Sequence, residues 1–275
     1  MLELKYKGYK TQDFENMNEV AEYLKSQKDL NEYELTHQTG MFYGCGKFED
    51  TLKRLKYGDQ VETTRYLDKL KQLEKGLDTD EDFKMDVEGF AYDMGAVVSG
   101  EPECCINTGA PKTKPYMKIF IDIGYNGGVS ADTIANRGVA ICQLISNLLS
   151  QGYILDIYVI HFIDTYEDGH YAQRIKLTTD YFSISQLAYA GTCEFFRIVS
   201  WLLTAIQMKE HSYTGDGRSM PSATVIKEMK KEGLFIPSGY TDGRFNSCDT
   251  EQAIKYVTEI YNDYIEEQKK SEIML

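Results

Sequence analysis

Residues 117–132 read MKIFIDIGYNGGVSAD, and this stretch decides the fold. Its first part, residues 119–123, is a short apolar run rich in β-branched residues, which is typical of a strand buried on both faces. A glycine-rich segment follows at 124–128, and apolar or small residues then recur at gaps of three and four up to residue 149, which is the period of a helix. A buried strand, a glycine-rich turn and a helix begin a βαβ unit, and in open α/β sheets ligands bind at the carboxyl ends of such strands.

Further elements follow this unit along the chain. Gln151 and Gly152 indicate the end of the central helix. Two strands are expected at 153–163 and 170–179, and the short polar connection between them predicts an antiparallel hairpin with a more exposed second strand. A long helix is expected over 183–209, a short helix over 222–232, a strand over 234–237 and a charged helix over 250–269. The predicted fold is therefore three-layer α/β, with a mostly parallel sheet that carries an antiparallel edge hairpin.

The first third of the chain has a different pattern. A short strand-like piece precedes a helix at 17–28, which Asn16 or Asn18 would cap, and two more helices are expected at 49–57 and 60–77. Residues 78–82, four of which are acidic, form the best candidate boundary. The sequence thus predicts a mainly helical N-terminal extension at 1–82 and an α/β core with a C-terminal helix at 83–275.

Composition limits the class of function. The chain has 275 residues, of which 42% are hydrophobic and 27% charged, and this is typical of a folded globular protein. A net charge of −13 argues against general binding to nucleic acid. The lysines of the helix at 222–232 lie on one face, which we interpret as a solvated surface. No apolar run is long enough to span a bilayer and no signal-peptide core is seen, so we expect a cytoplasmic protein without membrane contact.

The order of the central elements resembles the first half of a von Willebrand factor A-like domain, over residues 115–245. In that family the first strand ends in an Asp-x-Ser-x-Ser metal motif. The matching residues here are Asp122, Gly124 and Asn126, so the aspartate is kept and both serines are lost. Thr241-Asp242-Gly243 is similar to the tripeptide that follows the fourth strand in that family. The resemblance implies a degenerate metal site at the end of the strand.

Two interpretations of Asp122 remain open. It could bind a divalent cation such as Mg²⁺ or Mn²⁺, with Asn126, Ser130 and Asp242 supplying further oxygens, because hard cations need several oxygen ligands. Alternatively it caps the following turn through local hydrogen bonds. The loss of both serines favours the second interpretation.

A second resemblance comes from Ser99-Gly100-Glu101-Pro102-Glu103-Cys104. This segment, ahead of such a core, is similar to a family of bacteriophage-encoded proteins of unknown function. The resemblance implies a phage protein, in the cytoplasm of the producing cell or associated with the virion.

Our functional hypothesis is a non-enzymatic protein that binds a protein partner, as a virion component or as an intracellular effector. The alternative is a metal-dependent enzyme acting on a nucleotide or another phosphorylated small molecule, with Glu101, Glu103 and His161 as catalytic residues. His161 would be a general base held by Asp164, although a structural histidine between two apolar neighbours is the more common arrangement. RNA binding is a third, weaker hypothesis. The pattern does not indicate an oligomeric state.

Overall fold

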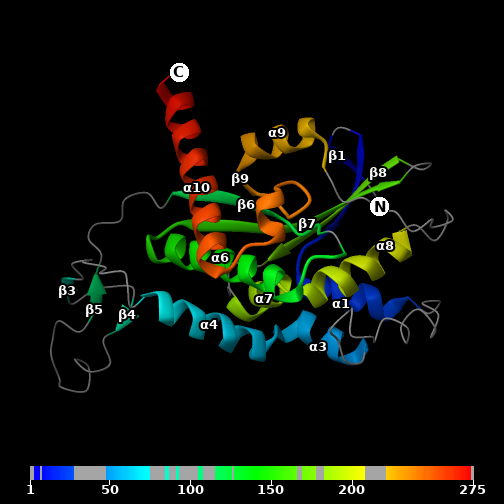
Figure 1. Ribbon diagram of the computed structural model, residues 1–275, viewed down its shortest axis with the longest axis horizontal. Helices are drawn as coiled ribbons and strands as arrows, with labels where there is room; N and C mark the ends of the chain where they lie inside the picture. The colour runs from blue at the N-terminus through cyan, green and yellow to red at the C-terminus, as the bar shows by residue number, and fades with distance from the viewer. Residues whose placement is uncertain are drawn as a thin grey trace. The chain divides into compact units, whose positions relative to one another are not determined.

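The computed structural model describes most of the chain (Figure 1). The described residues are 3–6, 8–27, 48–74, 84–86, 91–92, 105–107, 115–125, 127–165, 169–177, 183–207 and 221–273. The chain divides into two compact units, one of Met1–Leu70 with Tyr116–Leu275 and the other of Lys71–Pro115. The sequence analysis placed its boundary after residue 82.

The larger unit contains a six-stranded sheet. In spatial order its strands are β1 (Glu3–Tyr6), β2 (Tyr9–Phe14), β8 (Gly169–Leu177), β7 (Ile154–Thr165), β6 (Tyr116–Asp122) and β9 (Leu234–Ile236). The pairs β2–β8, β7–β6 and β6–β9 are parallel, whereas β1–β2 and β8–β7 are antiparallel. The predicted α/β class and the mostly parallel sheet are thus confirmed.

Strand β6 occupies the position that its apolar sequence predicts. It lies between β7 and β9, and Ile119, Phe120 and Ile121 are all buried. Ile119 and Ile121 belong to the larger hydrophobic cluster, whereas Phe120 belongs to a second one, because successive side chains of a strand point to opposite faces. A strand with apolar contacts on both faces needs no polar alternation.

The hairpin formed by β7 and β8 is confirmed, but its predicted position at the edge of the sheet is wrong. β2 pairs in parallel with the outer side of β8, from Tyr9 opposite His170 to Phe14 opposite Ile175. β1 then continues the sheet beyond β2. The second hairpin strand is consequently more buried than predicted, with Tyr171, Ala172 and Ile175 almost fully enclosed.

Helices cover both faces of this sheet, an arrangement consistent with three layers. On one face α6 (Ala131–Ser150) supplies Ile134, Val139 and Ile145 to the larger cluster, together with α10 (Thr250–Ile273). On the other face α9 (Ala223–Glu232) supplies Val225 and Met229 to the second cluster. Figure 1 shows α9 and α6 on opposite sides of β6. No helix in the described part of the chain is long and apolar enough to cross a membrane.

Two helices begin or end at residues that the sequence predicts. The hydroxyl of Ser130 accepts a hydrogen bond from the Thr133 amide and caps the start of α6. The helix ends at Ser150, and Gln151 and Gly152, which has φ of 81°, follow it. Asn16 caps α1 (Met17–Ser26) in the same way through the Glu19 amide. The predicted helix stop and the N-terminal helix are confirmed.

The single long helix predicted over 183–209 is wrong. The structure has α7 (Ile184–Ala190), then a π-helical segment (Phe195–Ser200) that runs into α8 (Trp201–Gln207). The break falls where α7 meets α6, since a Cβ added to Gly191 would lie 2.9 Å from Gly138 Cα. The hydroxyl of Thr192 accepts from the Phe195 amide and begins the next segment.

The N-terminal residues belong partly to the sheet and partly to helices α1, α3 (Phe48–Tyr57) and α4 (Gln60–Glu74). Gly58, between α3 and α4, has φ of 74°, and a Cβ on it would lie 2.3 Å from the Ser185 carbonyl carbon. Arg54 on α3 binds the buried carboxylates of Glu194 and Asp59, the latter at 3.2 Å. These contacts tie α3 to α7 and the π-helical segment.

Between residues 75 and 114, the described residues of the smaller unit form three short strands. They are β3 (Lys84–Asp86), β5 (Cys105–Asn107) and β4 (Ala91–Tyr92), and β5 pairs antiparallel with each of the other two. The strands form a separate sheet of their own.

Candidate functional site

Asp122, the last residue of β6, is the centre of the candidate site. Its side chain is fully buried. Oδ1 accepts a hydrogen bond from the Gly124 amide at 3.1 Å, the local turn cap that the sequence favoured. Oδ2 accepts from the Ser238 hydroxyl at 2.7 Å and from the Thr241 hydroxyl at 2.9 Å, with the Ser238 amide at 3.4 Å. The carboxylate therefore receives donors from two loops that are more than 100 residues apart.

The segment after β9 carries these donors to Asp122. β9 runs parallel to β6, with Ile121 opposite Ile236, so both strands end at the same edge of the sheet. The amides of Thr241 and Asp242 donate to the Ser238 carbonyl at 3.1 and 2.8 Å, which closes a tight turn. The turn holds both hydroxyls toward β6.

Arg137 on α6 joins the same two strand ends. Its side chain is buried, and Nη2 donates to the carbonyls of Asp122 at 2.8 Å and Ile236 at 3.1 Å. The guanidinium also lies over the rings of Tyr125 at 5.7 Å and Phe245 at 5.3 Å. We name Asp122, Arg137, Ser238 and Thr241 the strand-end latch.

Burial controls the charge of the latch. It raises the pKa of Asp122, although the hydrogen bonds from Ser238, Gly124 and Thr241 and the charge of Arg137 act in the opposite direction. Burial likewise raises the pKa of Tyr125 to about 12. Oδ2 already accepts from the Ser238 and Thr241 hydroxyls, so a cation bound to that oxygen would compete with these two hydrogen bonds.

The other predicted metal ligands have different partners. Ser130 caps α6, as described above. Asp242 binds the Arg244 guanidinium at 2.7 Å; burial acts to raise the pKa of Asp242, but the Arg244 hydrogen bonds outweigh it and the pKa is lowered. Asn126 lies outside the described residues. Within the described ranges, no group of three or more His, Cys, Asp or Glu residues could hold a metal ion.

Of the alternative catalytic residues, Glu101 and Glu103 lie outside the described residues. His161 faces the Phe196 ring, with the centroids 5.9 Å apart, and pairs across the strands with Gln173. Burial lowers the pKa of His161 to about 4, although a side-chain hydrogen bond with Gln173 acts to raise it, so the ring is neutral at physiological pH. The side chain of Asp164 also lies outside the description, so its suggested role as the partner of His161 stays a prediction.

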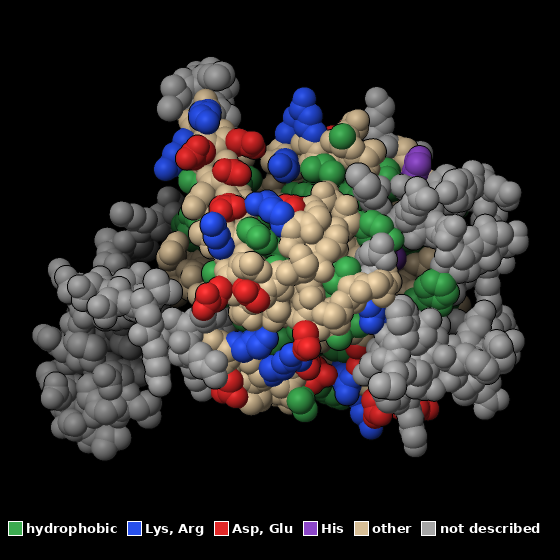
Figure 2. All heavy atoms as spheres, in the orientation of Figure 1, with side chains coloured by type: hydrophobic (Ala, Val, Ile, Leu, Met, Phe, Trp, Pro, Cys, Tyr) green, Lys and Arg blue, Asp and Glu red, His purple; other side chains and the backbone are tan. Residues whose placement is uncertain are grey.

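The glycine-rich turn at 124–128 contacts an arginine, and the lysines of α9 face solvent. Arg197 donates to the carbonyls of Gly127 at 3.1 Å and Val129 at 2.6 Å, which ties the turn to the π-helical segment. Lys227, Lys230 and Lys231 of α9 are exposed, consistent with a solvated face. Figure 2 shows basic side chains in the region of this helix.

Comparison with known proteins gives a family. Residues 5–264 match a family described as a domain of unknown function, DUF7192. The chain belongs to this family. Its description names no activity, ligand or partner. No curated protein and no solved structure matches. The matched range includes every residue of the strand-end latch, so the latch lies within the DUF7192 domain.

The sequence analysis did not predict two residues of the strand-end latch, Arg137 and Ser238. Arg137 stands between Ile134, Gly138 and Ile141 on the apolar side of its helix, and a charged residue in such a position is the signal that could have found it. Ser238 follows the short strand β9 directly after Pro237, at the end where ligands and loops gather. Thr241 was noted only as part of a tripeptide.

Proposed function

We propose that this DUF7192 protein is a non-enzymatic binding protein whose von Willebrand A-like core engages a protein partner. The spatial order β8-β7-β6-β9, with β8 antiparallel, supports the likeness of the core to that family. The position of Thr241 beside Asp122 supports it as well. The proposed bacteriophage origin, in a virion or as an intracellular effector, rests on residues 99–104 alone.

One observation carries the non-enzymatic part of the proposal. The carboxylate at the strand end, which would be the first ligand of a cation, is enclosed and hydrogen-bonded on both oxygens. Catalytic metal sites keep an open coordination position, and hard cations require several oxygens at once. In the strand-end latch the Asp122 carboxylate instead accepts hydrogen bonds from the hydroxyls of Ser238 and Thr241. Its role is to fix two strand ends rather than to bind substrate.

Exposed apolar side chains support a protein partner. Tyr57, the last residue of α3, and Val61, the second residue of α4, are 71% and 77% exposed. Aromatic residues are enriched in protein interfaces, and Tyr57 places a ring at this junction. We propose this junction as part of the binding surface.

A thermal-shift titration with Mg²⁺, Mn²⁺ and Ca²⁺ tests the non-metal role of the latch. We expect no cation-specific stabilisation of the wild type or of Asp122→Asn. Asp263→Asn, which alters an exposed carboxylate on α10, is the matched control. Binding at about 100 times Kd would stabilise the protein by about 2.7 kcal/mol. A shift of that kind that is lost in Asp122→Asn and kept in Asp263→Asn would overturn the proposal.

Recovery of partners from the producing cell tests the surface. The double variant Tyr57→Ser/Val61→Ser should lose partners that the wild type retains, equally with Mg²⁺ and with EDTA, while its melting temperature stays close to that of the wild type. The control Tyr116→Ser/Ile154→Ser removes a similar pair, 55% and 50% exposed, from the start of β6 and β7. Equal losses in the two double variants would refute a specific surface.

A further inference from the structure

The segment Phe195–Ser200 is π-helical and runs directly into the α-helical residues of α8. A π-helix joins residue i to residue i+5, whereas an α-helix joins i to i+4, and π-helical turns are rare and frequent at functional sites. Because each residue advances an α-helix by about 100°, a change from π-helical to α-helical pairing turns side chains toward different neighbours. The segment therefore has two alternative arrangements, and its contacts decide between them.

Glu194 holds the start of this segment to α3. Its buried carboxylate binds the Arg54 guanidinium of α3 and accepts a hydrogen bond from the Tyr189 hydroxyl at 3.1 Å. Arg54 also binds Asp59, which accepts from the Val61 amide of α4 at 2.9 Å. Removing one partner of a buried ion pair leaves the other charge uncompensated. A displacement of α3 therefore acts directly on the start of the π-helical segment.

The middle of the segment contacts the chain that follows β6. Arg197 Nη2 donates to the carbonyl of Gly127 in the glycine-rich turn at 3.1 Å and to that of Val129 at 2.6 Å. The ring of Phe196 lies against the ring of Tyr125, with the centroids 5.8 Å apart. Both contacts depend on the directions that π-helical pairing gives to two consecutive side chains.

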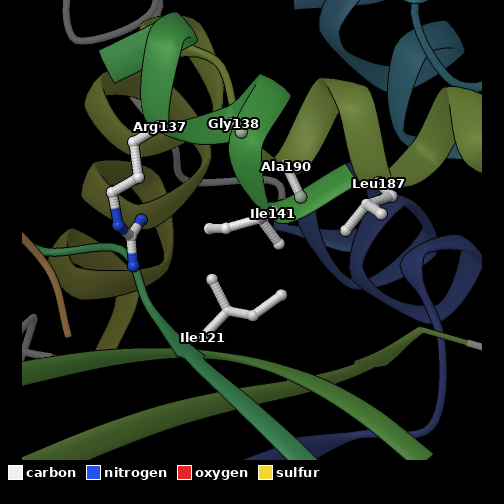
Figure 3. A pocket seen from close by; sticks show the side chains of 7 residues that line it. Ile121, Arg137, Gly138, Ile141, Leu187 and Ala190 are labelled. Atoms are coloured by element: carbon white, nitrogen blue, oxygen red, sulfur yellow. The ribbon is translucent and has the colours of Figure 1, made fainter. Parts of the chain in front are cut away.

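The helix before the segment is packed closely on α6. Figure 3 shows the side chains of Leu187, Ala190 and Ile141 around a small cavity between α7, α6 and β6. At the end of α7, a Cβ on Gly191 would lie only 2.9 Å from Gly138 Cα. Closely packed elements change between discrete arrangements rather than deform continuously. The adjustable part is therefore the π-helical segment that follows the break after α7.

We propose that the π-helical segment is a conformational relay between α3 and the glycine-rich turn. While Arg54 holds Glu194, the segment keeps its π-helical pairing and Arg197 binds the turn. When Arg54 is displaced, the segment changes to α-helical pairing and Arg197 leaves the turn. Tyr57 of the proposed binding surface is the last residue of α3, so a partner bound there would act on this relay. The relay itself does not depend on partner binding.

Trp201, the first residue of α8, provides a reporter for the first test. It is the single tryptophan of the chain, follows the segment directly and is 36% exposed. Arg54→Ala should change its emission maximum and its quenching by acrylamide, whereas Lys53→Ala, at an exposed lysine of the same helix, should leave both at wild-type values. If Arg54→Ala does not fold, Arg54→Lys replaces it, because lysine lacks the fork that binds two carboxylates. Unchanged Trp201 fluorescence in the folded variant would overturn the relay.

Hydrogen exchange at the other end of the relay is the second test. In Arg54→Ala, the amides of residues 127–130 should exchange faster than in the wild type, and the increase should exceed that of the α9 amides by at least about fivefold, the low end of typical coupling between sites. Helix α9 is the internal reference, because it packs on the other face of the sheet. Equal increases at the turn and in α9 would mean general destabilisation and would overturn the inference. Neither test requires a partner, so a failure of the relay is distinct from a failure of the proposed function.

Discussion

Replacing Asp122 by alanine measures what the strand-end latch contributes to stability. The substitution removes the acceptor for two hydroxyls, at 2.7 and 2.9 Å, and for the amides of Gly124 and Ser238. Hydrogen bonds to a charged group contribute about 1.5–3 kcal/mol each, and buried amides left without an acceptor cost about 1–3 kcal/mol. The burial that raises the pKa of Asp122 offsets part of this gain. We expect a net loss of about 3 kcal/mol in the free energy of unfolding.

Asp122→Asn should cost less than Asp122→Ala. The amide oxygen can still accept from Gly124, and the hydroxyls of Ser238 and Thr241 can rotate to accept from the amide nitrogen. We expect a loss of about 1–2 kcal/mol. Urea denaturation of the wild type, both variants and the exposed control Asp263→Ala gives the comparison. An Asp122→Ala protein as stable as the control would refute the reasoning.

The pH dependence gives a further check on the same residue. Because the folded pKa of Asp122 is raised, the folded state keeps its proton at pH values where the unfolded state has lost it. The stability of the wild type relative to Asp122→Asn is therefore greatest below the unfolded pKa, and it falls as the pH rises through the folded pKa. Unfolding curves across the acidic range should show this difference. If the stability of the wild type relative to Asp122→Asn increased as the pH rises, the reasoning would be refuted.

Three further predictions follow from burial and backbone geometry. Burial lowers the pKa of His161 to about 4, so the free energy of unfolding should fall by about 1–2 kcal/mol as the pH falls from 6.5 toward 4, because the unfolded state takes up the proton first. Unfolding curves of His161→Gln should lack this loss. An NMR titration that gives His161 a pKa near 6.5 would refute the prediction. Gly58→Ala should destabilise by about 2–4 kcal/mol and Gly152→Ala by about 1 kcal/mol, since both have positive φ but only Gly58 has a backbone atom in the way; equal melting temperatures would contradict the clash. Arg54→Ala should lower the free energy of unfolding by about 2–3 kcal/mol, after allowance for its 34% exposed side chain, because two buried carboxylates lose their cation. The control Lys53→Ala, at an exposed lysine, should lower it by under about 0.5 kcal/mol. Denaturation midpoints of the two variants give the comparison.

Local features were predictable from the sequence. The apolar run of β6, the stop of α6 before Gly152 and the cap of α1 at Asn16 each depend on residues within a few positions of one another. The turn-capping role of Asp122 toward Gly124 is of the same kind. Backbone propensity and side-chain period carry this information directly.

Contacts across long separations were not predictable. The pairing of β2 with β8, which removed the hairpin from the edge of the sheet, has no local signature in either strand. The same holds for Ser238, which reaches Asp122 only through the parallel pairing of β9 with β6. Arg137 lies on α6, and its bond to the Ile236 carbonyl depends on the same distant strand. The break after α7 depends on Gly191 meeting Gly138, so a helical period on its own could not show it.

The pairing of β2 with β8 sets an order of events during synthesis. Asp13 lies opposite Arg174, 161 residues later in the chain. At about 5–20 residues per second, a ribosome needs roughly 8–30 s to make the intervening chain. During that interval β2 has only β1 to pair with. The earliest strands of the sheet are therefore among the last to be incorporated, and the nascent chain must carry an unpaired strand edge until the hairpin of β7 and β8 has emerged.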